Sequence, residues 1–171
     1  MHVRYQPSCV SGFTIVEILV VIGVIAILTV ISVVSYSGII QHAQDSAVRH
    51  DIANIATQTK LHWTDNRRFP TVAEFKAIGV HINKQTYGVN PVGATIFYCV
   101  DNAGTTYSLV ARVKSSTIIK YLSSTDQISA YSGSTTAPQL CLDSGIVGTT
   151  STVQYTGFTN NGSWYPWVLD S

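Results

Sequence analysis

The sequence predicts an α+β fold in which one long amino-terminal helix packs, through its later half, on a small antiparallel β-sheet. Three observations support this prediction. An apolar run from Phe13 to Val34 is long enough to cross a membrane, helical periodicity continues to about Trp63, and segments rich in β-branched and aromatic residues follow Lys84. The 171 residues suffice for one globular domain beside a membrane anchor.

The apolar run is almost free of polar groups. Of the 22 residues from Phe13 to Val34, 16 are Phe, Ile, Leu or Val, and only Glu17 is charged. About 18 or more such residues are needed to span the hydrocarbon layer of a membrane. The Val and Ile content would also suit a buried strand, but strands usually contain only about 4–8 residues. The length therefore favours a single membrane-spanning helix.

Glu17 is the informative residue of this run. On the insertion scale, sixteen favourable residues contribute roughly −5 to −10 kcal/mol, whereas an acidic residue at mid-helix costs about 3 kcal/mol. Insertion therefore tolerates Glu17 without explaining it. An ionisable group in a membrane segment is a functional hypothesis that needs a partner. The alternative is that Glu17 sits near the membrane interface and is only tolerated there.

The stretch Gly12-Phe13-Thr14-Ile15-Val16-Glu17, followed by the apolar run, resembles the class III signal of type IV pilins and pseudopilins. The resemblance implies that a membrane aspartyl peptidase, the prepilin peptidase, cuts after Gly12 and that the new amino terminus at Phe13 is N-methylated. It also implies an assembly role for Glu17, which would pair with the Phe13 amine of an incoming subunit.

Three segments follow from this resemblance and from the periodicity of the chain. Residues 1–12 form a leader peptide, residues 13–38 a transmembrane and polymerisation helix, and residues 39–171 a globular head that includes the amphipathic half of the helix. Cleavage of the leader would remove Cys9 and leave Cys99 and Cys141 in the exported part. An even number of cysteines in an oxidising compartment predicts a disulfide, and two separate buried thiols are the alternative.

Beyond Ile39 the helix is predicted to be amphipathic. Its apolar stripe contains Ile39, Ile40, Ala43, Ala47, Val48, Ile52, Ile55, Ala56 and Trp63. The opposite face is predicted to carry polar residues that include Asp45, Arg49 and Asp51, with Asp45 and Arg49 at the spacing of an ion pair. The apolar stripe needs a cover, and the β-rich sequence that follows is the available one within the chain.

The later elements are predicted from local patterns. Thr71 and Glu74 have the spacing of a capping box for a short helix from about Val72 to Ile78. Strands are expected over 94–100, 106–113, 118–122 and 128–131, with residues 101–104 as a hairpin turn. The aromatic tail from Phe158 to Trp167 is interpreted as packed across the sheet, with a carbohydrate-binding patch as the alternative.

The sequence offers no catalytic constellation. It contains no GxSxG, HExxH or phosphate-binding glycine loop, and its histidines do not have metal-ligand spacing, so no enzyme activity, metal or cofactor is expected. With 10 basic and 9 acidic residues, the chain shows no bias toward a polyanion, and no nucleic-acid contact is predictable.

The resemblance implies a structural subunit of a type IV pilus or pilus-like filament. Its expected partners are copies of itself or other pilins, the prepilin peptidase, and the assembly platform with its ATPase. It would cross the cell membrane once before assembly and then lie in an extracellular pilus or an envelope-spanning pseudopilus. Alternatives are a minor pilin, a type II secretion pseudopilin and, more distantly, a single-pass anchored binding domain or enzyme that never polymerises.

Overall fold

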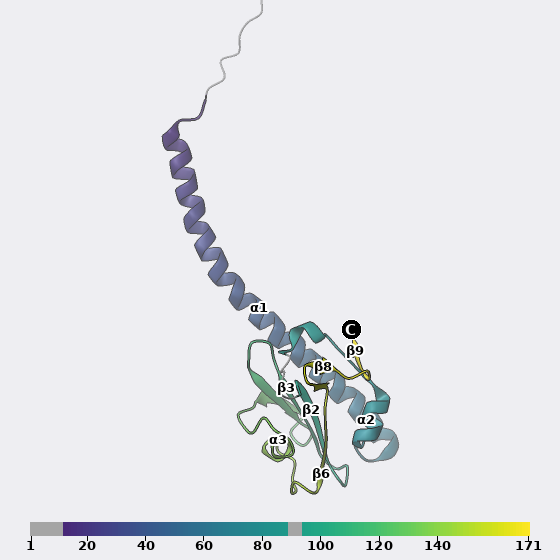
Figure 1. Ribbon diagram of the computed structural model, residues 1–171. Coiled ribbons are helices and arrows are strands. Elements are labelled where there is room, and N and C mark those ends of the chain that lie inside the picture. The colour runs from purple at the N-terminus through teal and green to yellow at the C-terminus, as the bar shows by residue number, and fades with distance from the viewer. Residues whose placement is uncertain (1–11, 89–93) are drawn as a thin grey trace, which may run out of the picture. The chain divides into compact units, whose positions relative to one another are not determined.

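The computed structural model describes residues 12–88 and 94–171. Its order of elements is that of the predicted α+β fold: a long amino-terminal helix, a short helix, and then strands that form an antiparallel sheet (Figure 1). The chain divides into two compact units between Ile40 and Gln41. The leader up to Ser11, including Cys9, lies outside the described residues.

Helix α1 extends from Ile15 to Asn66, three residues beyond the predicted end near Trp63. The left-handed backbone of Arg67 (φ 55°) follows it directly. The capping box predicted for the second helix is present: α2 spans Val72–Ile78, the Thr71 side chain accepts from the Glu74 N–H, and the Glu74 carboxylate accepts from the Thr71 N–H.

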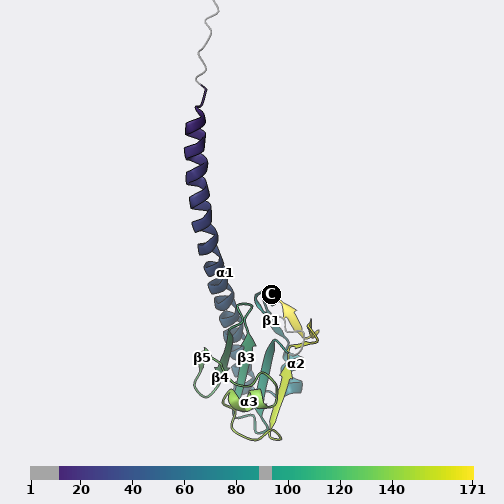
Figure 2. The ribbon, with the colours of Figure 1, turned by 60° about the vertical axis from the view of Figure 1, so that its left-hand side comes forward.

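The main sheet of the head has five antiparallel strands in the order β5-β4-β3-β2-β6. Four of them match the predicted strands to within two residues: β2 is Ile96–Asp101, β3 is Tyr107–Arg112, β4 is Ile118–Leu122 and β5 is Gln127–Ala130. The fifth, β6 (Val153–Gly157), pairs with β2 and was not predicted. Figure 2 shows this sheet with helix α3 (Gln139–Asp143), which was also not predicted, in front of it.

Four shorter strands complete the head. The tail strand β9 (Val168–Asp170) runs parallel to β1 (Val80–Ile82), and β7 (Thr159–Asn160) forms a small hairpin with β8 (Ser163–Trp164). A 3-10 helix, η1 (Lys84–Thr86), follows β1. The aromatic tail packs on the core as interpreted from the sequence, since Trp164 and Trp167 lie against it and Phe158 is buried.

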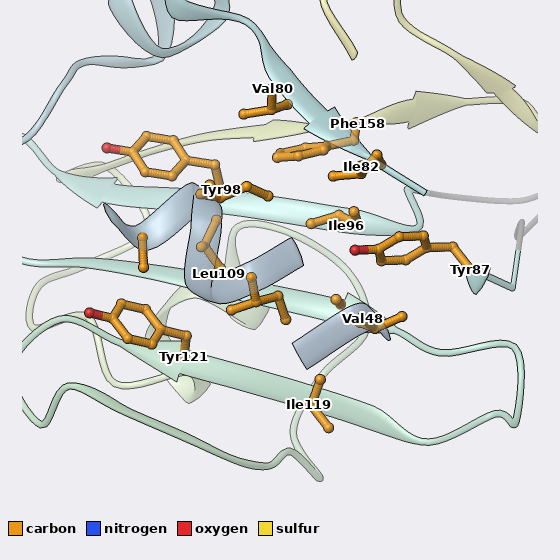
Figure 3. Packing of buried hydrophobic residues seen from close by; sticks show 14 of the residues in the cluster. Val48, Val80, Ile82, Tyr87, Ile96, Tyr98, Leu109, Ile119, Tyr121 and Phe158 are labelled. Carbon is orange, nitrogen blue, oxygen red and sulfur yellow. The ribbon is translucent and has the colours of Figure 1, made fainter. Parts of the chain in front are cut away.

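The core lies between the later half of α1 and one face of the sheet. Strand register brings Tyr98, Leu109 and Tyr121 side by side on that face. Figure 3 shows these side chains in one cluster with Val48 of α1, Val80 and Ile82 of β1, and Phe158. Buried tyrosines also bond the backbone: the Tyr107 hydroxyl donates to the Ala56 carbonyl (3.3 Å) and the Tyr98 hydroxyl to the Pro70 carbonyl (2.6 Å).

The predicted apolar stripe of α1 is only partly buried. Val48, Ile52, Ile55 and Ala56 belong to the core, whereas Ile39, Ala43 and Trp63 are exposed. The predicted polar face is wrong for Asp51, whose exposed fraction is 6%. Asp51 falls three residues after Val48 and four before Ile55, so the helical period places it on the buried face.

The predicted ion pair between Asp45 and Arg49 is also wrong within the described residues, where no salt bridge joins them. Asp45 instead accepts a hydrogen bond from the Ser115 hydroxyl at 2.9 Å. Ser115, in the turn after β3, therefore takes the place of Arg49 as the partner of Asp45. Helical spacing does not secure the ion pair, because an exposed pair contributes only a few tenths of a kcal/mol.

The buried Asp51 carboxylate joins α1 to the segment after β1. Its Oδ2 accepts from the Asn83 N–H (3.1 Å) and from the Tyr87 hydroxyl (2.9 Å). Burial raises the pKa of Asp51 above its ordinary value, while these two hydrogen bonds and the neighbouring His50 act in the opposite direction. Asp51 therefore binds a proton more readily in the folded protein than in the unfolded chain.

The second face of the sheet carries a separate buried cluster under α3. Cys99, Val110, Leu140, Cys141 and Ile146 lie in it. The predicted disulfide between Cys99 and Cys141 is present, with a Cα–Cα distance of 5.6 Å across a sequence separation of 42 residues. The disulfide fastens α3 to strand β2, and the buried Ser108 and Ser144 hydroxyls, 2.5 Å apart, add a polar contact between the sheet and the segment after α3.

The disulfide should stabilise the head strongly. In the chain-entropy model a closed loop of this length contributes about 4 kcal/mol to the free energy of unfolding. We therefore expect the Cys99→Ala/Cys141→Ala double variant to lose most of that amount in urea unfolding of the detergent-solubilised chain. The wild type under reducing conditions should match the variant, and equal midpoints for oxidised wild type and variant would contradict this expectation.

Asp51 should make stability depend on pH. Because its pKa is raised in the folded state, the folded protein keeps a proton that the unfolded chain loses above about pH 4. The free energy of unfolding of the wild type minus that of Asp51→Asn should therefore fall as the pH rises from about 4 to 7. A difference that is flat or rises would contradict this assignment. Tyr87→Phe removes a hydrogen bond that lowers the pKa of Asp51 in the folded state, so it should extend the fall to higher pH without changing the pH at which the fall begins.

Candidate functional site: the amino-terminal signal

The candidate site is the first turn of α1 with the residues just before it. Thr14 stands immediately before the first helical residue, Ile15. The Glu17 N–H donates to the Thr14 hydroxyl oxygen (3.2 Å), and the Thr14 N–H donates to Glu17 Oε2 (3.2 Å). This reciprocal pair is a capping box, which satisfies backbone donors that the first turn of a helix leaves free.

The carboxylate of Glu17 is held by its own chain. The Thr14 hydroxyl also donates to Oε2, at 3.1 Å. Glu17 thus lies at the positive end of the helix macrodipole, where an anion is favoured. Sequence reasoning missed Thr14 as the partner of Glu17, although the Thr-x-x-Glu spacing that identified Thr71 and Glu74 occurs here as well.

A comparison of the two capping boxes shows what is distinctive about Glu17. In the head, both terminal nitrogens of Arg68 also donate hydrogen bonds to the Glu74 carboxylate, at 2.7 and 2.5 Å. These bonds lower the pKa of the Glu74 carboxyl far below its usual range. Within the described part of the chain, Glu17 has no cationic partner. The Glu17 carboxylate is therefore available to pair with a cationic group outside this capping box.

The residues before the helix are accessible. Phe13 is 82% exposed, and a Cβ placed on Gly12 would meet no described atom within 4 Å. The fold of the described chain thus places no steric demand for glycine at position 12.

The helix that follows is suited to a hydrocarbon environment. Ile15–Ser32 has a mean hydropathy of 2.9, and none of it is buried within the molecule. Its hydroxyls are internally satisfied, because Thr29 donates to the Ile25 carbonyl (2.7 Å) and Ser32 to the Leu28 carbonyl (2.8 Å). By length and composition it can cross a membrane, which supplies the apolar solvent for its exposed side chains.

The described residues of the head show no cluster suited to a metal ion. They contain no group of three or more His, Cys, Asp or Glu side chains placed to hold a metal ion. A shallow hollow lined by Arg68, Asp101 and Gly104 has its charged groups engaged, Arg68 by Glu74 and Asp101 by the Thr105 and Thr106 N–H groups.

Of the predicted site residues, the structure places Gly12, Phe13 and Glu17 within one short accessible segment and joins Cys99 to Cys141 in the head. It adds Thr14 as the partner of Glu17. The cleavage site, the methylation site and the assembly role remain predictions, since they concern other molecules.

Comparison with protein families gives a match between residues 7–33 and the prokaryotic N-terminal methylation motif. This match contains Gly12, Phe13 and Glu17 together with the membrane helix. Comparison with curated proteins and with solved structures found no match.

Proposed function

We propose that this chain, a prepilin-like protein with the N-terminal methylation motif of type IV pilins and pseudopilins, is a structural subunit of a type IV pilus or a pilus-like filament. The observation that carries the proposal is the motif itself, an accessible Gly12-Phe13 bond directly before a capped helix that can cross a membrane. The motif implies processing by the prepilin peptidase and assembly into a filament.

In the first step, the peptidase hydrolyses the bond between Gly12 and Phe13. Water adds across the amide, which leaves a carboxylate on Gly12 and an amine on Phe13. The amine nitrogen then takes a methyl group from a sulfonium methyl donor, which leaves as the thioether while the nitrogen loses a proton. Residues 1–12 are the leader that is lost, residues 13–38 the membrane and polymerisation helix, and residues 39–171 the head. Loss of the leader removes Arg4 and leaves nine basic and nine acidic side chains.

In the second step, Glu17 directs assembly. The amine released at Phe13 is a cation next to the Thr14–Glu17 capping box, and the same amine on an incoming subunit can pair with the Glu17 of its neighbour. Coulomb attraction grows as the dielectric constant falls, so the pairing is stronger in hydrocarbon than in water. An unpaired carboxylate is costly in hydrocarbon. Neighbouring subunits therefore favour the position along the filament axis that pairs the Glu17 of one with the Phe13 amine of the other.

The head lies on the exported side of the membrane in this scheme. The Cys99–Cys141 disulfide supports this placement, because disulfides persist in oxidising compartments. Before assembly the chain crosses the cell membrane once, and afterwards it lies in the pilus or pseudopilus together with other pilins. The assembly platform and its ATPase are the further partners. The roles of major pilin, minor pilin and secretion pseudopilin share all these features.

Processing should produce a defined amino terminus. Mass spectrometry of the exported protein should find N-methyl-Phe13 as the first residue. Gly12→Val should leave the precursor intact from Met1, because its side chain obstructs the approach to the backbone, whereas Gly23→Val, the same substitution further along the helix, should still be cut. An intact Met1 in the wild type, or a cut beyond Val34, would refute the pilin assignment and favour a non-polymerising anchored domain.

Two variants separate the charge of Glu17 from its capping function. Glu17→Gln keeps a side chain that can close a capping box but removes the charge, so membrane insertion should persist while filament yield drops at least tenfold in electron micrographs of sheared fractions. Thr14→Ala breaks the box and keeps the charge, so filaments should form. Equal defects in both variants would assign Glu17 to helix capping alone, and normal filaments with Glu17→Gln would remove its assembly role.

A further inference from the structure

The hairpin of β7 and β8 carries a three-residue pattern that neither the fold nor the proposed function explains. The pattern is Asn-x-Ser, formed by Asn161, Gly162 and Ser163. It is the acceptor pattern for attachment of a glycan to asparagine. In the other asparagines, the residue two positions on is neither serine nor threonine: Asn54, Asn66, Asn83, Asn90, Asn102 and Asn160. The pattern therefore singles out Asn161.

The tip of this hairpin is a tight two-residue turn. Asn160 pairs with Ser163, and the two residues between them have left-handed backbone, with φ of 45° at Asn161 and 79° at Gly162. Positive φ at both central residues defines a type I′ turn, for which Asn-Gly is a preferred pair. The turn thus accounts for Asn161 and Gly162 but places no demand on the hydroxyl of Ser163.

The hairpin is anchored at its base and open at its tip. Thr159 is buried, its hydroxyl oxygen accepts from the Thr95 N–H (2.8 Å), and Trp164 packs edge-on against Tyr87 at 5.9 Å between ring centroids. Asn161 and Ser163 are both exposed, and their side chains make no hydrogen bond within the described residues. The amide and the hydroxyl are therefore free to enter the site of a modifying enzyme.

We propose that Asn161 is an N-glycosylation site. This inference rests on the export of the head that the proposed function includes, because the acceptor pattern is used on exported surface loops. The donor is a sugar chain linked through pyrophosphate to a lipid. The Asn161 amide nitrogen forms a bond to the anomeric carbon, the bond from that carbon to the pyrophosphate oxygen breaks, and the oxygen leaves with the electron pair while the amide loses a proton.

A glycan at this position would change the surface of the head without disturbing its core. The tip is joined to the core only through its buried base, so a bulky hydrophilic group can be added there without moving Thr159 or Trp164. It would also lie two to four residues from the exposed Ser163 and Tyr165, and so increase the hydration of an aromatic part of the surface.

The test is peptide mapping by mass spectrometry, after chymotryptic digestion, of full-length protein purified from its native host. We expect a carbohydrate mass on the peptide that contains Asn161. Asn161→Asp, which removes the amide but tolerates left-handed backbone, and Ser163→Ala should both abolish it. Ser163→Thr preserves the pattern and Asn160→Asp changes a neighbour outside it, so both should retain the mass.

An unmodified Asn161 in the native protein would overturn the proposal, as would a carbohydrate mass that survives both Asn161→Asp and Ser163→Ala. Thermal unfolding and the Cys99–Cys141 linkage verify that each variant is folded. The same digest reads the amino terminus, which separates the two proposals. N-methyl-Phe13 with a bare Asn161 rejects the glycan alone, whereas an uncut Met1 rejects the filament function.

Discussion

The structure of the head depends on the burial of one stripe of α1. Val48, Ile52 and Ile55 are almost fully buried, and the sheet, the β1–β9 pair and the aromatic tail all contribute side chains to their cover. Burial of an aliphatic side chain of this size contributes about 1.5–3 kcal/mol, so a stripe of three or four holds the helix firmly on the sheet. Asp51 lies in the same stripe, and its hydrogen bonds from Asn83 and Tyr87 make its burial tolerable.

Helix α1 therefore meets two different requirements with one continuous backbone. The segment Ile15–Ser32 exposes its aliphatic side chains and satisfies the hydroxyls of Thr29 and Ser32 internally, which suits hydrocarbon. The second half of α1 buries one stripe and exposes the remainder, which suits an aqueous compartment. The candidate site lies at the start of this helix, where Thr14 is the residue that holds Glu17 in the described part of the chain. Glu74 in the otherwise similar box of the head has Arg68 as a counter-charge, whereas Glu17 has no cationic partner among the described residues.

The head carries a disulfide and an exposed hairpin, both far in sequence from the amino-terminal motif. The disulfide fastens α3 over the second face of the sheet, so that β3 is covered on both sides and its residues from Tyr107 to Ala111 are all buried. A sheet covered on both faces presents its edges, turns and loops to solvent. The β7–β8 hairpin, a separate two-stranded sheet, is also anchored at its base and exposed at its tip.

Local patterns allowed the sequence alone to determine the apolar segment, the long helix, the Thr71 capping box, four strands and the methylation motif. Each depends on hydropathy, period or turn chemistry within about twenty residues. Thr14 was missed although its signal is equally local. The tertiary structure decided the burial of Asp51, the exchange of Arg49 for Ser115 as the partner of Asp45, and the pairing of β9 with β1. It also decided the cover of α3 on the second face of the sheet. These features depend on contacts between residues far apart in the chain, where the geometry of the fold selects among partners that local spacing leaves equivalent.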